Sequence, residues 1–349
     1  MTFIAGYIYK NSVQIVSDSA VTGPKRPENH DIPNLIFCSS FRETVHISGD
    51  QAISESANKL NNIDGRILIA YAGLTSEGDG TLRDLILRFK VNFGKPISHV
   101  IKEYFAENIY KNSQYIIGFN EEDKPHLFVC YENGRSYLEN NRPGIAFAGV
   151  FPYNIHESAK WAFQWASKLG YSEDETLVFM QALLQTISVT NRTIEYRVGG
   201  HFNGALVSRE GVRWSRDTLY IMYSTNNFEL GDKFIVAKYN RENSTFLIGN
   251  DSKWLFHPSI GSNSKEEVKK KWNDSIHECY NNELPDFCVF ISYDKRTVVS
   301  ISNESGKNHR IERVHGGIQI PYHIKIEMNK YLNPPDGTIG IYTYSNFIK

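Results

Sequence analysis

The sequence of 349 residues predicts an α+β fold in four layers, an αββα sandwich with two sheets face to face and helices outside, followed by a small β-rich C-terminal domain. The order of the patterns predicts this architecture: two sets of strands, two helices, more strands, two helices and closing strands. An apolar fraction of 41% supports a large core, and 20 Tyr and 20 Phe suit a strand-rich protein.

The chain begins with a predicted β-hairpin. Its strands are Phe3 to Tyr9 and Val13 to Ser17, and a polar turn at Lys10-Asn11-Ser12 joins them. A polar segment with three prolines follows from Gly23 to Pro33, and we expect it to be a loop. Two weak strand patterns come next, at residues 35–38 and 44–47.

A second hairpin is predicted around Asp64-Gly65. The strand before this turn begins at Lys59, and the strand after it runs from Ile67 to Ala72-Gly73. The later patterns predict helices at 81–89, 97–112, 153–169 and 173–189, and strands at 114–119, 126–131, 145–149, 201–208 and 212–214. Beyond residue 230 they predict strands at 233–239, 246–248, 287–292, 297–302 and 338–342, and one amphipathic helix at 264–280.

Composition excludes several classes of protein. Lys and Arg (38) balance Asp and Glu (39), so the net charge of −1 gives no footprint for nucleic acid or an anionic membrane. The sequence holds no apolar run long enough to span a bilayer, no signal peptide, no CxxC pair, and no metal-ligand or nucleotide-binding motif. We therefore expect a cytoplasmic protein with reduced cysteines, without metal or other cofactor.

Thr2 is the first candidate for chemistry. Removal of Met1 would leave a hydroxyl and a free α-amine on one residue. A hydroxyl needs a base before it can attack, and a terminal amine with a pKa of about 7.7–8.0 is a suitable base at neutral pH.

Three motifs together resemble the proteasome β-subunits, which are N-terminal-nucleophile hydrolases. They are the first hairpin, its end in Asp-Ser-x-x-Thr at 18–22, and the pattern of lysine, Asp-Gly turn and Ala-Gly at 59–73. The resemblance covers about residues 2–215 and implies the same four-layer fold. It predicts a hydrolase domain at residues 1–225, with an insertion at about 23–56. Residues 230–349 form the second predicted domain and match nothing that we recognise.

The resemblance also implies roles for individual residues. Thr2 is the expected nucleophile, Asp18 holds and orients Lys59, and the backbone N–H of Gly73 stabilises the oxyanion. The side chain before the scissile bond is expected in a pocket lined by Val21, Ala57, Tyr71 and Thr75. We expect Thr2→Ala and Lys59→Ala to abolish hydrolysis with little change in the melting temperature.

Three positions depart from the family pattern. Gly149 and Val198 stand where the family has serines, and Glu195 replaces an aspartate four residues before a Gly-Gly pair. We expect Glu195 to take over the aspartate's catalytic role, and Gly149→Ser to raise or preserve activity by restoring a hydroxyl near the nucleophile.

The predicted function is hydrolysis of peptide bonds by a threonine protease through an acyl-enzyme on Thr2. Two alternatives stay open: a non-catalytic proteasome-like scaffold subunit and an amidase that acts on small molecules. The substrate is then a peptide or a small amide, a homo-oligomer is expected, and the sequence does not determine whether an ATPase or another partner is involved.

Overall fold

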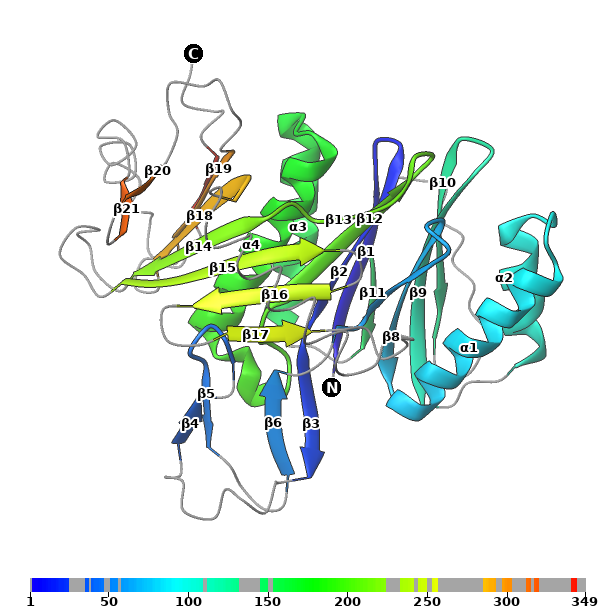
Figure 1. Ribbon diagram of the computed structural model, residues 1–349, viewed down its shortest axis with the longest axis horizontal. Coiled ribbons are helices and arrows are strands. Elements are labelled where there is room, and N and C mark those ends of the chain that lie inside the picture. The colour runs from blue at the N-terminus through cyan, green and yellow to red at the C-terminus, as the bar shows by residue number, and fades with distance from the viewer. Residues whose placement is uncertain are drawn as a thin grey trace.

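The computed structural model describes residues 2–24, 35–37, 39–46, 51–55, 58–108, 112–131, 145–149, 153–223, 233–241, 244–249, 253–256, 285–292, 297–302, 312–314, 317–319 and 340–343. The chain has a mixed fold of helices and several sheets (Figure 1). The predicted helix at 264–280 lies outside the described residues, as does Ala57.

Two antiparallel sheets are built from the first 214 residues. The five-stranded sheet has the order β11-β1-β2-β12-β13, and the four-stranded sheet has the order β10-β9-β8-β7. The strands are β1 (Phe3–Tyr9), β2 (Ser12–Asp18), β7 (Leu60–Ile63), β8 (Ile67–Gly73), β9 (Ser113–Glu121), β10 (Lys124–Cys130), β11 (Ile145–Gly149), β12 (Phe202–Ser208) and β13 (Gly211–Trp214). Alternation along each strand places one set of side chains on each face, so each sheet can bury both faces.

The two sheets share one apolar core. Ile4, Val13 and Ile15 of the five-stranded sheet cluster with Leu68 and Ile116 of the four-stranded sheet. Helices α1 (Thr75–Val91) and α2 (Ile97–Glu107) cover the other face of the four-stranded sheet. Helices α3 (Tyr153–Leu169) and α4 (Glu173–Asn191) cover the other face of the five-stranded sheet (Figure 1).

A third sheet of seven strands lies on the far side of α4. Its order is β17-β16-β15-β14-β18-β19-β22. The strands are β14 (Thr218–Tyr223), β15 (Lys233–Arg241), β16 (Ser244–Gly249), β17 (Lys253–Phe256), β18 (Phe287–Ser292), β19 (Thr297–Ser302) and β22 (Gly340–Thr343), and a separate pair joins β20 (Glu312–Val314) to β21 (Gly317–Gln319). Tyr220 and Val289 of this sheet belong to the same core as Leu183 of α4.

Helix α4 is therefore covered on both sides. Every residue from Thr176 to Ser188 is buried, which is the pattern of a helix that has no solvent-facing side. Its first turn is fixed by a capping box, in which Ser172 and Glu175 satisfy each other's backbone N–H groups. The division into two domains between residues 225 and 230 stays a prediction. Strand β14, which precedes this boundary, belongs to the same sheet as the strands that follow it, and this sheet shares a core with α4.

The predicted loop starts later than expected, and the strand pair predicted after it at 35–38 and 44–47 is present. Strand β3 (Ala20–Pro24) pairs with β6 (Gln51–Glu55), and β4 (Leu35–Phe37) pairs with β5 (Thr44–His46). The insertion at about 23–56 thus begins and ends in a pair of antiparallel strands, β3 and β6. The expectation of a continuous loop from Gly23 is wrong for its first two residues, because Gly23 and Pro24 pair with Ala52 and Gln51.

None of the helices in the described part combines the length and the apolar character that a membrane span requires. Of the four cysteines, the two that the structure describes, Cys130 and Cys288, are buried free thiols. Burial raises the pKa of both thiols, that of Cys130 to about 11 and that of Cys288 to about 12, so they behave as core residues rather than nucleophiles.

Candidate active site

Asp18 is the central group of the candidate site. It is the last residue of β2, and its Oδ1 accepts hydrogen bonds from the Phe3 backbone N–H at 2.9 Å and from Lys59 Nζ at 2.7 Å. Its Oδ2 accepts from the Gly199 backbone N–H at 3.1 Å. One carboxylate therefore connects the residue after Thr2, the buried lysine and the Gly199–Gly200 corner.

Lys59 lies just before β7 and is almost completely buried. The side-chain exposures of Lys59 and Asp18 are 8% and 0%, and Lys59 Nζ also donates to the Ala20 carbonyl at 2.8 Å. Burial lowers the pKa of Lys59, and the charge of Asp18 opposes this shift. The structure thus brings together Asp18 and Lys59, the two residues that the sequence predicts as a pair.

Thr2 is buried beside the start of β1. Its neighbour Phe3 pairs with Gly149 across the β1–β11 ladder. Gly149 has a φ of +96°, and a Cβ built there would lie 1.7 Å from the Thr2 carbonyl oxygen and 3.3 Å from the Ala72 side chain. The expectation that a serine is tolerated at this position is therefore wrong, because any side chain would collide with the backbone of Thr2.

Gly73 ends β8 in a conformation that favours glycine, with a φ of +136°. A Cβ on Gly73 would lie 2.0 Å from the Asn112 carbonyl oxygen, so the backbones meet closely at this point. Tyr71, two residues earlier on β8, is buried and donates a hydrogen bond to Asp79 of α1 at 2.8 Å. Val21 is half-buried on β3, whereas Thr75 is exposed at the start of α1.

The side chain of Glu195 is exposed and paired with a surface arginine. Glu195 lies on a 3₁₀ turn (Thr193–Tyr196), is 40% exposed and forms an ion pair with Arg192 at 2.7 Å. Among the described residues it forms no hydrogen bond or ion pair with Thr2, Asp18 or Lys59. Val198 packs into the core beneath the five-stranded sheet. The catalytic role expected of Glu195 has no support from this geometry.

Sequence reasoning missed a second buried polar cluster beside the site. Glu43 and Glu55 from the insertion bind the backbone of Gly200 and His201, the two residues after Gly199. Only His201 carried a signal in the sequence, because it follows a Gly-Gly pair. The two glutamates come from the predicted insertion, in which the sequence shows only weak strand patterns and no sign of buried carboxylates.

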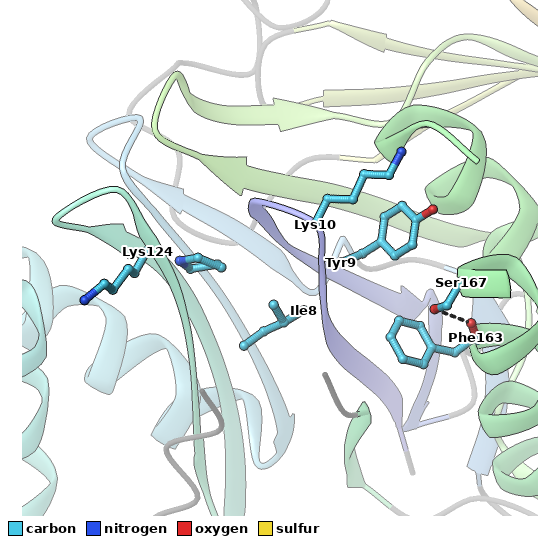
Figure 2. A pocket seen from close by; sticks show the side chains of 7 residues that line it. Ile8, Tyr9, Lys10, Lys124, Phe163 and Ser167 are labelled. Atoms are coloured by element: carbon cyan, nitrogen blue, oxygen red, sulfur yellow. Dashed lines mark hydrogen bonds between the residues drawn. The ribbon is translucent and has the colours of Figure 1, made fainter. Parts of the chain in front are cut away.

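A cavity of about 620 Å³ lies at the opposite end of β1. Seven residues of β1 separate this end from Thr2, a span of about 20 Å. Figure 2 shows Lys10 and Lys124 at its rim, with their ammonium groups pointing away from each other. The residues that line the cavity are Ile8, Tyr9, Lys10, Lys124, Pro125, Phe163 and Ser167, and they include none of the candidate site residues.

Comparison with known proteins gives little further assignment. No family model and no curated protein matches the chain. Among solved structures, the eukaryotic HslV from Trypanosoma brucei aligns with 60% of this chain and 100% of its own, at 14% sequence identity and a TM-score of 0.40. A match this weak assigns neither a fold nor an activity to the chain.

Proposed function

We propose that this chain is a threonine-type N-terminal-nucleophile hydrolase that cleaves amide bonds, with Thr2 as the nucleophile once Met1 has been removed. The two sheets and the two helix pairs then form the αββα sandwich of that superfamily. The proposal rests above all on the Asp18–Lys59 ion pair, which is buried and hydrogen-bonded to the residue next to Thr2.

The proposed reaction uses the two polar groups of Thr2. The hydroxyl oxygen attacks the amide carbonyl carbon and its proton passes to the α-amine, while the carbonyl oxygen becomes an oxyanion. The amine then gives this proton to the leaving nitrogen, the C–N bond breaks, and an ester to Thr2 remains. Water, activated by the same amine, hydrolyses the ester and restores the hydroxyl.

The surrounding residues support these steps in different ways. A positive charge on Lys59 favours the neutral amine and the developing alkoxide of Thr2. Asp18 holds Lys59 in place, and we assign the oxyanion to the backbone N–H of Gly73. Val21, Ala57, Tyr71 and Thr75 are proposed to line the substrate pocket, which Tyr71 makes smaller or more polar than an aliphatic residue would.

Intact mass and a Thr2 variant test the proposal together. Active protein should lack Met1, and Thr2→Ala should lower the hydrolysis of fluorogenic peptides by at least about 10³-fold, because it removes the nucleophile. Thr2→Ser, which keeps a hydroxyl, is the matched control and should retain activity. Activity that survives in Thr2→Ala, or in protein that keeps Met1, would contradict the mechanism.

A non-catalytic scaffold is the second candidate. Two observations favour it: Gly149 offers no hydroxyl near Thr2, and Glu195 is held in a surface ion pair. A panel of peptides and small amides separates the candidates. A scaffold cleaves neither, a peptidase cleaves the peptides, and an amidase cleaves only the small amides.

Self-association is proposed as well. Three large apolar side chains at the end of α1 and just after it are exposed: Leu87 at 60%, Val91 at 84% and Phe93 at 87%. Such a group suits a subunit contact. Light scattering should give a mass that is a multiple of 40.0 kDa, and Val91→Glu should lower it. A mass of one chain over a wide concentration range would contradict this.

A further inference from the structure

Glu55 is the centre of a buried cluster next to the candidate site. Its Oε1 accepts a hydrogen bond from the His201 backbone N–H at 2.6 Å and lies 2.7 Å from Nδ1 of the same histidine. The side chains of both residues are 1% exposed. Glu55 also accepts hydrogen bonds from the Ser19 hydroxyl and from the Ser40 hydroxyl.

Glu43, the residue before β5, binds the same corner. Its Oε2 accepts from the Gly200 backbone N–H at 2.9 Å and from the Ser39 hydroxyl at 2.8 Å. Its Oε1 accepts from the hydroxyl of Ser188, on α4, at 2.7 Å. Glu43 thus ties the insertion to both α4 and the Gly199–Gly200 pair.

Three consecutive backbone N–H groups therefore reach three different carboxylates. Gly199 donates to Asp18, Gly200 donates to Glu43, and His201 donates to Glu55. The two glycines have φ angles of +152° and +74°, which let the N–H groups of this corner diverge. A Cβ on Gly200 would lie 2.4 Å from the Ser19 hydroxyl oxygen, so the corner leaves no room for a side chain there.

We propose that Glu43 and Glu55 are positioning residues, which hold the Gly199–His201 backbone where the Gly199 N–H binds Asp18 and thereby keep Lys59 in place. The catalytic consequence rests on the function proposed above, whereas the effect on Lys59 does not. Two adjacent glycines have the greatest backbone freedom of any residues, so the corner needs outside groups to fix it. Neither glutamate is expected to touch a substrate.

The charges around Glu43 support this role. Burial raises the pKa of Glu43 to about 7, and the hydrogen bonds from Ser188, Ser39 and Gly200 oppose the shift. The carboxylate of Glu55 also raises the pKa of Glu43. Burial would raise the pKa of Glu55 as well, but its contact with His201 outweighs this effect and the pKa of Glu55 is lowered. Arg42, the residue before Glu43, directs its guanidinium onto the Phe234 ring, 4.3 Å from the ring centroid.

The reactivity of Lys59 towards an amine-acylating reagent tests the proposal without requiring activity. Glu43→Gln and Glu55→Gln should each speed the labelling of Lys59, read by peptide mass spectrometry, by about tenfold or more, because local opening becomes easier. Hydrogen exchange of peptides covering 197–203 should also become faster. Glu103→Gln, which changes an exposed carboxylate on α2, is the control and should label at the wild-type rate.

The outcomes are distinct. Folded Glu43→Gln and Glu55→Gln proteins that label Lys59 at the wild-type rate would overturn the proposal. If Glu43→Gln does not fold, Ser188→Ala is the milder change, which removes one hydrogen-bond partner of Glu43 and one of Thr193, and unchanged labelling in both Ser188→Ala and Glu55→Gln would overturn the proposal equally. Faster labelling of Lys59 supports the positioning role. If wild-type protein at the same time shows no hydrolysis that depends on Thr2, the proposed function fails but the positioning role stands.

The kinetic constants kcat and KM separate a positioning role from a general loss of stability. In active protein, Glu55→Gln should lower kcat by about 10–100-fold and leave KM nearly unchanged, since small displacements of a catalytic group have effects of this size. A rise in KM alone would overturn positioning.

The pH dependence of unfolding reports on Glu43 itself. Its pKa lies above the ordinary 4.5 in the folded chain, so the folded state holds the proton more tightly between about pH 5 and 7. As pH rises through this range, wild-type protein should lose stability relative to Glu43→Gln, by up to about tenfold in the unfolding equilibrium constant per pH unit. A difference that does not change with pH would contradict the burial of Glu43 as an ionisable group.

Discussion

Lys59→Ala is expected to destabilise the folded chain by about 3–5 kcal/mol in addition to abolishing hydrolysis. The change removes the partner of a fully buried carboxylate and leaves Asp18 as an uncompensated charge. This differs from the expectation drawn from sequence, in which Lys59→Ala leaves the melting temperature nearly unchanged. Urea denaturation followed by circular dichroism measures the loss.

A matched control and a double variant make this result specific. Lys95→Ala breaks an exposed pair with Glu103 at 3.9 Å and should cost no more than about 1 kcal/mol. The combination of Lys59→Met with Asp18→Asn should be less destabilising than the sum of the two single changes, because it removes both charges. A Lys59→Ala protein as stable as wild type would show that the buried pair does not form.

Gly149→Ser is expected to destabilise the chain by about 4 kcal/mol or more, or to prevent folding. It combines two separate costs: a side chain at a φ of +96°, and a Cβ placed 1.7 Å from the Thr2 carbonyl oxygen. Each cost alone reaches about 1–3 kcal/mol. Soluble yield, circular dichroism and urea unfolding measure the effect.

Gly94→Ser is the control for Gly149→Ser. Gly94 has nearly the same φ, +94°, but nothing lies within 4 Å of a Cβ built on it. It should therefore show the conformational cost alone, about 1–2 kcal/mol. If the two variants were equally stable, the close approach of β11 to Thr2 would be wrong.

Elements with strong local patterns could be predicted from the sequence. Strand β1 and helix α3 match the predicted ranges at both ends, and the Asp64-Gly65 turn joins β7 to β8 as expected. The juxtaposition of Asp18 with Lys59 followed from the resemblance to a known family. Local patterns alone would not have supplied it, because 41 residues separate the two.

The true start of helix α1 and the whole of strand β14 were not predicted, because tertiary contacts determine them. Helix α1 begins at Thr75, six residues before its predicted start, through a stretch with two glycines that are poor helix formers. Gly78 is required there, since a Cβ on it would lie 2.2 Å from the Tyr71 ring. Strand β14 is buried at all six positions and so shows no alternation of polar and apolar residues.

The second buried cluster had no local signature at all. Glu43 meets Ser188 and Gly200 across 145 and 157 residues, and Glu55 meets His201 across 146. In sequence Glu43 comes just before a weak strand pattern and Glu55 lies in the predicted insertion, and no local feature marks either glutamate as buried. Contacts of such range depend on how the whole chain folds, so no local pattern of residues predicts them.

The burial of α4 on both sides determines how the chain can be shortened and how it can assemble. A chain cut at residue 225 would lose six of the seven strands that cover this helix, and apolar side chains such as Leu183 would meet water. The last third of the sequence thus supplies most of the sheet that covers one side of α4. A shortened protein should therefore aggregate through the exposed apolar side of this helix. For the same reason a second subunit cannot bind to α4, because both sides of this helix are already covered. The exposed apolar side chains at the end of α1, Leu87, Val91 and Phe93, offer a surface for that contact instead.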